Sequence, residues 1–347
     1  MNESTNLPTV TFGIPVLNAE EFLDRCLSSI MSQDYPKDKL EVIIADGGST
    51  DSTLEIARRH GATIVHNQKK LADFGIKLAA KQCGGEVLVI FAADNELGSK
   101  DWVRTIASAY RERPELACIW CDMVAGSDDP PINRYYEMIK SDPLMYSINK
   151  NLKDHYLATT HPERIGGHNF YFFKVEPSRP LVWGANGLSY RTDFVRHIIA
   201  VDEFVGDNDV FQIMVEEGHN LVGFSPTLKV LHHHLKSLSH WAAKWNRNYQ
   251  QHMVAQLESR NMGWAIAGNF KAKAALWLIY SLIPVFSSVH AVCLAVKDRN
   301  RYWLYHPLAS FMQASFLLRM TLGSKKGRTV LKGPGQQARK GEQTHDA

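Results

Sequence analysis

The stretch LEVIIADGGSTD, residues 40–51, decides the fold. Its first part, residues 40–45, is almost entirely apolar, which is typical of a strand buried on both faces of a parallel sheet. Its second part, from Asp46 to Asp51, is rich in residues that favour turns. The stretch therefore predicts a strand that ends in a polar loop, and in α/β proteins ligands bind beyond such strand ends.

Outward from this stretch, residues 9–123 alternate strand and helix patterns. Asn18 and Glu21 form a capping-box pattern that predicts a helix start, and Ser99 is predicted to cap a later helix. The alternation predicts an α/β fold with a mostly parallel, Rossmann-like sheet and flanking helices. The predicted strands are residues 10–15, 40–45, 63–66, 86–92 and 117–123.

The composition is that of a globular protein. The chain has 347 residues, of which 45% are hydrophobic and 22% charged, and its net charge of +3 gives no reason to expect a nucleic acid partner. Its five cysteines follow no disulfide pattern, so we expect reduced thiols and a cytoplasmic domain. Cys118 and Cys121 lie on a predicted strand and should face opposite sides, so they are not expected to share a metal.

Beyond residue 123 the pattern is less regular. Residues 127–182 show few long periodic runs, and order returns with predicted helices near 193–199 and 207–218 and a strand over 228–234. We predict one catalytic domain over residues 1–260, with a first half at 9–123 and a second at 124–260. Residues 324–347 are polar and basic, and we expect them to be disordered.

The region 261–323 carries two long apolar segments. Residues 274–296 contain no charged side chain, and residues 302–322 follow as a second apolar run. Basic residues flank both segments on every side, so two full spans would break the positive-inside rule. We therefore expect a hydrophobic helical hairpin at the membrane, re-entrant or interfacial. Two spans and a buried helical pair are the alternatives.

Polar residues that follow predicted strands are the candidate site. Asp46 and Asp94 each end a nearly continuous apolar strand, so we expect them to share one ligand site rather than to be ordinary turn formers. The hard carboxylate of Asp94 suits Mg²⁺ or Mn²⁺. His232 and His234 should share one face of their strand and can complete a metal shell. Asp207 is a candidate base or, alternatively, an N-cap.

These residues resemble a known family. Residues 14–18 (IPVLN), 42–51 (VIIADGGSTD) and 92–95 (AADN) are similar to the motifs of family 2 glycosyltransferases of the GT-A fold. The resemblance implies that Asp46 binds the nucleotide base, supported by the loop from Pro15 to Asn18. It further implies that Asp94 holds the metal and that Asp207 is the base of an inverting transfer. Asn186, in the segment 184–187, is expected near the donor diphosphate.

The chain departs from the family pattern at two places. Ala92 stands where the first aspartate of the D-x-D motif is usual, which bears on metal affinity and donor choice. Ala72 and Asp73 stand where many members have Arg-Asn, so Asp73 is expected at the donor site, with Lys70 able to supply the missing positive charge.

The resemblance implies a glycosyltransferase, and the two apolar segments suggest that it is membrane-associated. The expected donor is a UDP-sugar, or else a GDP-sugar, and the expected acceptor is a glycan or polyprenyl-linked sugar at the cytoplasmic face of the cell membrane. Residues 127–182 would shape the acceptor site. Two alternatives stay open. One is a catalytically weak protein that binds sugar nucleotides or glycans, suggested by Ala92. The other is a nucleotidyltransferase, although the sequence shows no glycine-rich phosphate loop near the first strand, which such an enzyme would need.

Overall fold

The computed structural model describes residues 7–140, 142–179, 181, 186–200, 206–248 and 270–323. The chain divides into two compact units: residues 1–129 with 149–234, and residues 130–148 with 235–347. We describe each unit by itself. The domain boundary predicted at residue 260 lies outside the described residues and stays a prediction.

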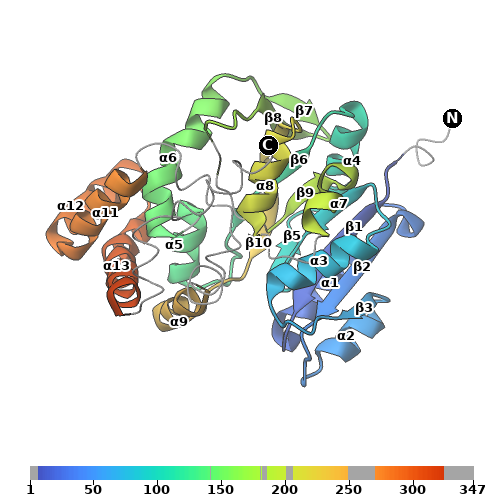
Figure 1. Ribbon diagram of the computed structural model, residues 1–347, viewed down its shortest axis with the longest axis horizontal. Helices are drawn as coiled ribbons and strands as arrows, with labels where there is room; N and C mark the ends of the chain where they lie inside the picture. Colours follow the sequence, from blue (N-terminus) through green and yellow to red (C-terminus); the bar gives the residue numbers. More distant parts are fainter. Residues whose placement is uncertain are drawn as a thin grey trace, which may run out of the picture. The chain divides into compact units, whose positions relative to one another are not determined.

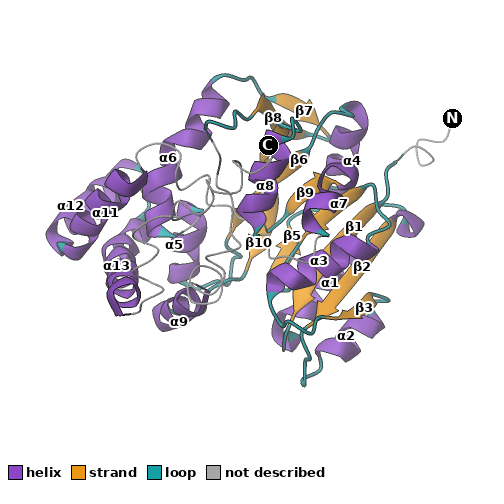
Figure 2. Ribbon diagram, viewed as in Figure 1, coloured by secondary structure: helices purple, strands orange, loops and turns teal. Residues whose placement is uncertain are grey.

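The first unit is built on one ten-stranded sheet with helices on both faces (Figures 1 and 2). The strand order is β3-β2-β1-β4-β9-β6-β10-β8-β7, and β5 pairs with β10 at its end. The strands are β1 (Val10–Val16), β2 (Leu40–Asp46), β3 (Thr63–His66), β4 (Val87–Ile90), β5 (Asn95–Leu97), β6 (Cys118–Val124), β7 (Glu163–Ile165), β8 (His168–Lys174), β9 (Leu188–Arg191) and β10 (Leu221–His232).

The expectation of a mostly parallel sheet was wrong, because the sheet is mixed. β3, β2, β1 and β4 run parallel, and so do β6 and β10. However, β9 lies antiparallel between β4 and β6, and β10 pairs antiparallel with β8 and β5. The N-terminal half therefore follows the predicted α/β pattern, whereas in the antiparallel half β5, β7 and β9 have only three or four residues and carry little periodicity.

Helices cover the sheet through two separate hydrophobic clusters. One face packs on α1 (Glu20–Met31), α2 (Thr53–Arg59) and α4 (Trp102–Glu112). The other packs on α3 (Ala72–Gln82), α7 (Thr192–Ile199) and α8 (Asp207–Glu216), which Figure 1 shows together against the sheet. Cys118 and Cys121 are both buried and free, and they belong to opposite clusters, as the strand period predicted.

Three local predictions need correction. Asn18 does not cap a helix, because α1 begins at Glu20 and Asn18 has a φ of 50°. Ser99 does not cap α4, whose N-cap position is Asp101. The segment 127–182 is also more regular than expected, since it contains α5 (Pro131–Ile139), α6 (Pro143–Ala158), β7 and β8.

The second unit is helical. Besides α5 and the start of α6 it contains α9 (Leu238–Asn248), α11 (Phe270–Leu282), α12 (Pro284–Lys297) and α13 (His306–Gly323), with a 3₁₀ turn, η4 (Arg301–Tyr305). Aromatic and aliphatic side chains of these helices form one core, centred on Tyr135, Trp241 and Trp303. Among the described residues no single helix has the length and apolarity of a membrane span, but Ala272–Leu282 and Pro284–Lys297 together pass that test as a pair bent by 92°.

Candidate functional site

Residues 46–51, called here the Asp46 loop, follow β2. Asp46 is only 4% exposed, and its carboxylate accepts hydrogen bonds from the backbone N–H groups of Gly48 (2.9 Å) and Ser49 (3.0 Å). Gly48 has a φ of +92°, a conformation that glycine adopts without steric cost. The sequence Asp-Gly-Gly-Ser thus closes a tight turn around its own aspartate at the carboxyl end of a buried strand.

The loop after β1 is tied to the Asp46 loop. Thr50 donates its backbone N–H to the side-chain oxygen of Asn18 (2.8 Å), and Asn18 donates its own backbone N–H to the Ser49 hydroxyl (2.9 Å). Pro15, half-buried, pairs in register with Ala45 on β2. The structure therefore brings Pro15, Asn18 and Asp46 together at one edge of the sheet.

Two further predicted residues lie close to the same edge. Asp73 is in the first turn of α3, which follows β3, the neighbour of β2. Lys70 has a φ of 58°, and its Nζ lies 3.9 Å from the position that a Cβ on Gly48 would take. The Lys70 ammonium therefore reaches over the Asp46 loop, where the sequence had suggested a compensating positive charge.

The predicted metal ligands also come together. Asp94 Oδ1 lies 3.7 Å from His232 Nε2, and Asp94 Oδ2 lies 3.8 Å from His234 Nδ1. One ligand atom from each of the three residues lies within 4.8 Å of the other two, so one ion can reach all three. The set, one carboxylate and two imidazoles, is chemically suited to a divalent metal. The role of the cluster as a metal site stays a prediction.

Backbone pairing explains why these ligands converge. β5 pairs antiparallel with the end of β10, with His232 opposite Asn95, and His233 donates its backbone N–H to the Asp94 carbonyl (2.8 Å). Asn186 was predicted near the donor diphosphate; its side-chain amide lies 3.0 Å from His232 Nε2. Asn186 therefore contacts one member of this cluster, His232.

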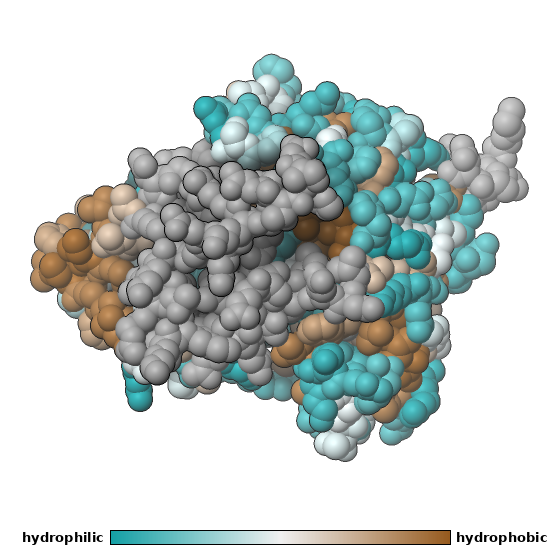
Figure 3. Space-filling view, viewed as in Figure 1, coloured by the Kyte–Doolittle hydropathy of each residue, from teal (hydrophilic) through white to brown (hydrophobic). Residues whose placement is uncertain are grey.

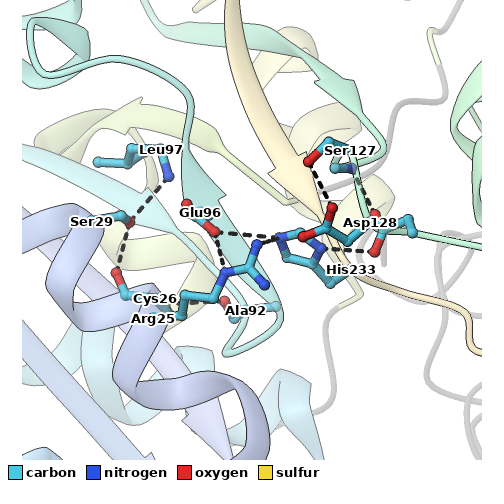
Figure 4. Close-up of polar contacts among 11 residues, drawn as sticks. Arg25, Cys26, Ser29, Ala92, Glu96, Leu97, Ser127, Asp128 and His233 are labelled. Atoms are coloured by element: carbon cyan, nitrogen blue, oxygen red, sulfur yellow. Dashed lines mark hydrogen bonds and ion pairs between the residues drawn. The ribbon is translucent and has the colours of Figure 1, made fainter.

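His233 points away from the cluster into a network that sequence reasoning missed (Figure 4). Its Nδ1 lies 2.9 Å from Asp129 Oδ1, and its Nε2 lies 3.0 Å from Arg25 Nη2. Arg25 Nε in turn donates to Glu96 (2.6 Å). The hydrogen bond to Asp129 raises the pKa of His233. Only the strand period hinted that His233 faces away from its neighbours; its partners come from distant segments.

Asp207 begins α8, but its side chain is not among the described parts of the structure. Trp183, Gly184 and Ala185 lie outside the described residues altogether. The N-cap of α8 is Gly206, which donates its backbone N–H to Asp209 Oδ2 (3.2 Å). The capping carboxylate is therefore Asp209, and the proposed base role of Asp207 stays a prediction.

Comparison with known proteins defines the class. The model of Glycosyl transferase family 2 matches residues 11–177, which contain the Asp46 loop and Asp94. Residues 11–177 therefore form a family 2 glycosyltransferase domain, as the motifs predicted.

Individual relatives cover only part of the chain. A dolichyl N-acetyl-alpha-D-glucosaminyl phosphate 3-beta-D-2,3-diacetamido-2,3-dideoxy-beta-D-glucuronosyltransferase of Methanococcus voltae is 31% identical over 119 residues, which are 31% of this chain and 37% of that protein. Glycosyltransferase AglE of Haloferax volcanii is 48% identical over 56 residues, 16% of this chain and 18% of that protein. The matched segments thus span well under half of these relatives.

A solved structure shares the fold. Mannosyltransferase PcManGT from Pyrobaculum calidifontis, in complex with GDP-Man and Mn²⁺, matches with a TM-score of 0.53 at 18% identity, over 89% of this chain and 86% of that one. This likeness supports the mixed α/β sheet with flanking helices.

Proposed function

We propose that this chain is an inverting glycosyltransferase that moves a sugar from a nucleotide diphosphate donor to a membrane-linked acceptor, assisted by Mn²⁺ or Mg²⁺. The observation that carries the proposal is the juxtaposition of Asp94, His232 and His234, in a family 2 domain whose Asp46 loop ends β2, a parallel strand two places from β4 in the same sheet. Ligands of α/β sheets bind at this edge.

The Asp46 loop binds the nucleoside part of the donor. The Asp46 carboxylate is fixed by two backbone N–H groups and keeps further acceptor capacity for the base or ribose. Pro15 and Asn18 support this loop, and Asp73 and Lys70 border it. The donor is a UDP-sugar in our preferred form of the proposal; GDP-Man, the ligand of PcManGT, makes a GDP-sugar the alternative.

Asp94, His232 and His234 hold the divalent cation, and the Asn186 amide lies 3.0 Å from His232 Nε2, the nitrogen that also faces Asp94. When bound, the cation neutralises the diphosphate that leaves the sugar. Because two of the three ligands are imidazoles, the set fits Mn²⁺ better than Mg²⁺, which prefers oxygen ligands. Mn²⁺ is also the ion in the PcManGT complex.

Asp207 is the proposed base. Its carboxylate takes the proton of an acceptor hydroxyl, and the hydroxyl oxygen then forms a bond to the anomeric carbon. The bond from that carbon to the diphosphate oxygen breaks in the same displacement, and its electron pair stays on the diphosphate. One displacement inverts the configuration at the anomeric carbon.

The acceptor is proposed to be a polyprenyl-linked sugar or a growing glycan at the cytoplasmic face of the membrane. The name of the Methanococcus voltae relative specifies a dolichyl phosphate-linked acceptor. In the helical unit, α11 and α12 expose large apolar side chains on the surface that Figure 3 shows in brown. They are Leu276, Ile279, Val285, Phe286, Val289, Val292 and Val296.

The proposed mode is interfacial or re-entrant rather than spanning. Each of these two helices also has a buried side, with Trp277 on α11 and Ala291 and Leu294 on α12, so only one side is available to lipid. The exposed cations Lys297, which ends α12, and Arg299 and Arg301, which follow it, suit anionic headgroups.

The transfer reaction is tested with a panel of UDP-, GDP- and dTDP-sugars and Mn²⁺, with membrane lipid extract as acceptor. We expect nucleoside diphosphate release from one donor, lost in Asp94→Ala and in Asp207→Asn. Donor binding without release would favour the alternative that Ala92 suggests, a protein that binds sugar nucleotides without turnover. If no donor binds, the proposal is wrong.

Membrane association is tested by flotation with anionic lipid vesicles. The double variant Val285→Asp/Val289→Asp should stay with the aqueous fraction, while the wild type floats. Leu17→Asp, which changes an exposed apolar residue of the other unit, is the matched control and should float. Equal flotation of all three proteins would contradict the proposed membrane surface.

A further inference from the structure

The side chain of His233 joins segments that are far apart in the sequence. It lies at the end of β10, between Asp129 from the loop after β6 and the pair formed by Arg25 on α1 and Glu96 on β5. Figure 4 shows Arg25 and Glu96 on one side of the imidazole and the segment of Ser127 and Asp128 on the other. The His233 side chain is 7% exposed, so these contacts are largely shielded from water.

Histidine is well suited to this place. Nδ1–H donates to the Asp129 carboxylate at 2.9 Å, and Nε2 accepts from the Arg25 guanidinium at 3.0 Å, since a guanidinium can only donate. The ring also stacks on Phe22, with a centroid distance of 6.5 Å. Asp129 is fixed in turn, because it accepts the backbone N–H of Gly126 (2.7 Å). The imidazole is thus held at both nitrogens and on one face.

The backbone of His233 is equally constrained. Its N–H donates to the carbonyl of Asp94, and its neighbours in the chain are His232 and His234. Glu96, two residues after Asp94, is linked to His233 through Arg25 and lies 3.4 Å from Nε2. The network therefore holds both segments that carry the three metal-cluster residues.

We propose that His233 is a positioning residue of the metal site: it clamps the end of β10 to the Asp94–Leu97 segment, so that Asp94, His232 and His234 converge. This inference rests on the proposed function only in taking the cluster as a metal site. Residues that orient metal ligands typically contribute 10–100-fold to metal affinity. His233 itself touches neither donor nor acceptor in this proposal.

The test is Mn²⁺ affinity of the metal-free protein, measured at one fixed pH by the electron paramagnetic resonance signal of free Mn²⁺. His233→Phe keeps the ring and its stacking on Phe22 but removes both hydrogen bonds. We expect about a 10-fold loss of Mn²⁺ affinity, in the range seen for such orienting residues. UDP or GDP affinity in EDTA should not change, because the Asp46 loop is untouched.

Two variants control for a general loss of structure. His168→Phe removes another imidazole–carboxylate pair of the same unit, with Asp101 at 3.3 Å, and should leave Mn²⁺ affinity unchanged. His233→Asn keeps a donor close to the Nδ1 position and should recover most of the affinity.

The possible outcomes separate the inference from the proposed function. If Asp94→Ala binds Mn²⁺ as tightly as the wild type, the metal site itself is wrong. If Asp94→Ala loses Mn²⁺ but folded His233→Phe keeps full affinity, the clamp is wrong. Should His233→Phe fail to fold, Asp129→Asn replaces it, since an amide still accepts the Gly126 N–H. Unchanged affinity in Asp129→Asn would then overturn the clamp.

Discussion

The Asp46 loop and the Asp94–His232–His234 cluster belong to the same sheet but are built in different ways. In the loop, Asp46 is hydrogen-bonded by residues two and three positions later, at 2.9 and 3.0 Å. In the cluster, Asp94 approaches His232 and His234 only to 3.7 and 3.8 Å, longer than hydrogen bonds. The hydrogen bonds that fix Asp46 come from within its own loop, whereas the geometry of the cluster depends on the contacts that hold two distant segments together.

The difference explains what each region can do. A loop closed by its own backbone N–H groups presents a fixed carboxylate, which suits recognition of a neutral, hydrogen-bonding base or ribose. Imidazoles and a carboxylate around a common point suit a cation, whose affinity depends steeply on ligand positions. Variants in the two regions should therefore separate donor affinity from metal affinity.

The largest effect is expected from Asp94→Ala. Loss of this ligand should lower kcat at least about 100-fold, since a bound cation contributes several kcal/mol of charge stabilisation in such transfers. The measurement is nucleoside diphosphate release at saturating donor across a Mn²⁺ titration. Donor affinity in EDTA should stay at the wild-type value; a parallel loss there would mean that the two regions are not separable.

Asp46→Ala should weaken donor binding rather than Mn²⁺ binding. Hydrogen bonds to a charged group contribute about 1.5–3 kcal/mol, so donor KM should rise about 10–100-fold. Mn²⁺ affinity of the metal-free protein should not change. Asp46→Asn is the matched variant, because its amide oxygen still accepts the N–H of Gly48 or Ser49 and keeps the turn. If Asp46→Ala weakened Mn²⁺ and donor binding equally, the assignment of donor binding to the Asp46 loop and of metal binding to the cluster would be wrong.

Asn186→Ala should have a smaller effect, and on Mn²⁺ affinity rather than on donor affinity. The Asn186 amide lies 3.0 Å from His232 Nε2, and a single neutral hydrogen bond contributes about 0.5–1.5 kcal/mol. Because that nitrogen also faces Asp94, the amide competes with the cation for it, so we expect Mn²⁺ affinity to rise about 2–10-fold on the same scale, with donor affinity in EDTA unchanged. A variant that loses donor affinity alone would instead support the diphosphate contact inferred from the family resemblance.

The comparison also shows what the sequence could predict. The strand of residues 40–46 and the turn after it are determined by neighbours in the chain, so their place in the fold and the position of Asp46 were predicted correctly. The shared face of His232 and His234 followed from the two-residue strand period. Both are local properties that one stretch of sequence contains.

Long-range contacts could not be predicted in this way. β9 is only four residues long and lies between β4 and β6, which turned an expected parallel sheet into a mixed one. The network of Arg25, Glu96, Asp129 and His233 joins four segments that are far apart in the sequence. Asn18 was assigned to a helix cap because its spacing to Glu21 fits one, yet it bonds across to Thr50.

The smallest predicted effect concerns the pH dependence of the Asp46 loop. Burial raises the pKa of Asp51, but hydrogen bonds from the Thr53 hydroxyl and N–H and from the Glu20 N–H outweigh it and hold the pKa below the ordinary 3.8. A carboxyl whose pKa is lower in the folded state stabilises the fold above its unfolded-state pKa, and the contribution is lost as the pH falls through the folded value. Asp51→Asn should therefore melt below the wild type at pH 7, and the gap should close as the pH falls below 3.8. Thermal melts in EDTA exclude any contribution of metal to this comparison. A gap that stays constant into acid would mean that the charge of the Asp51 carboxylate does not stabilise the fold.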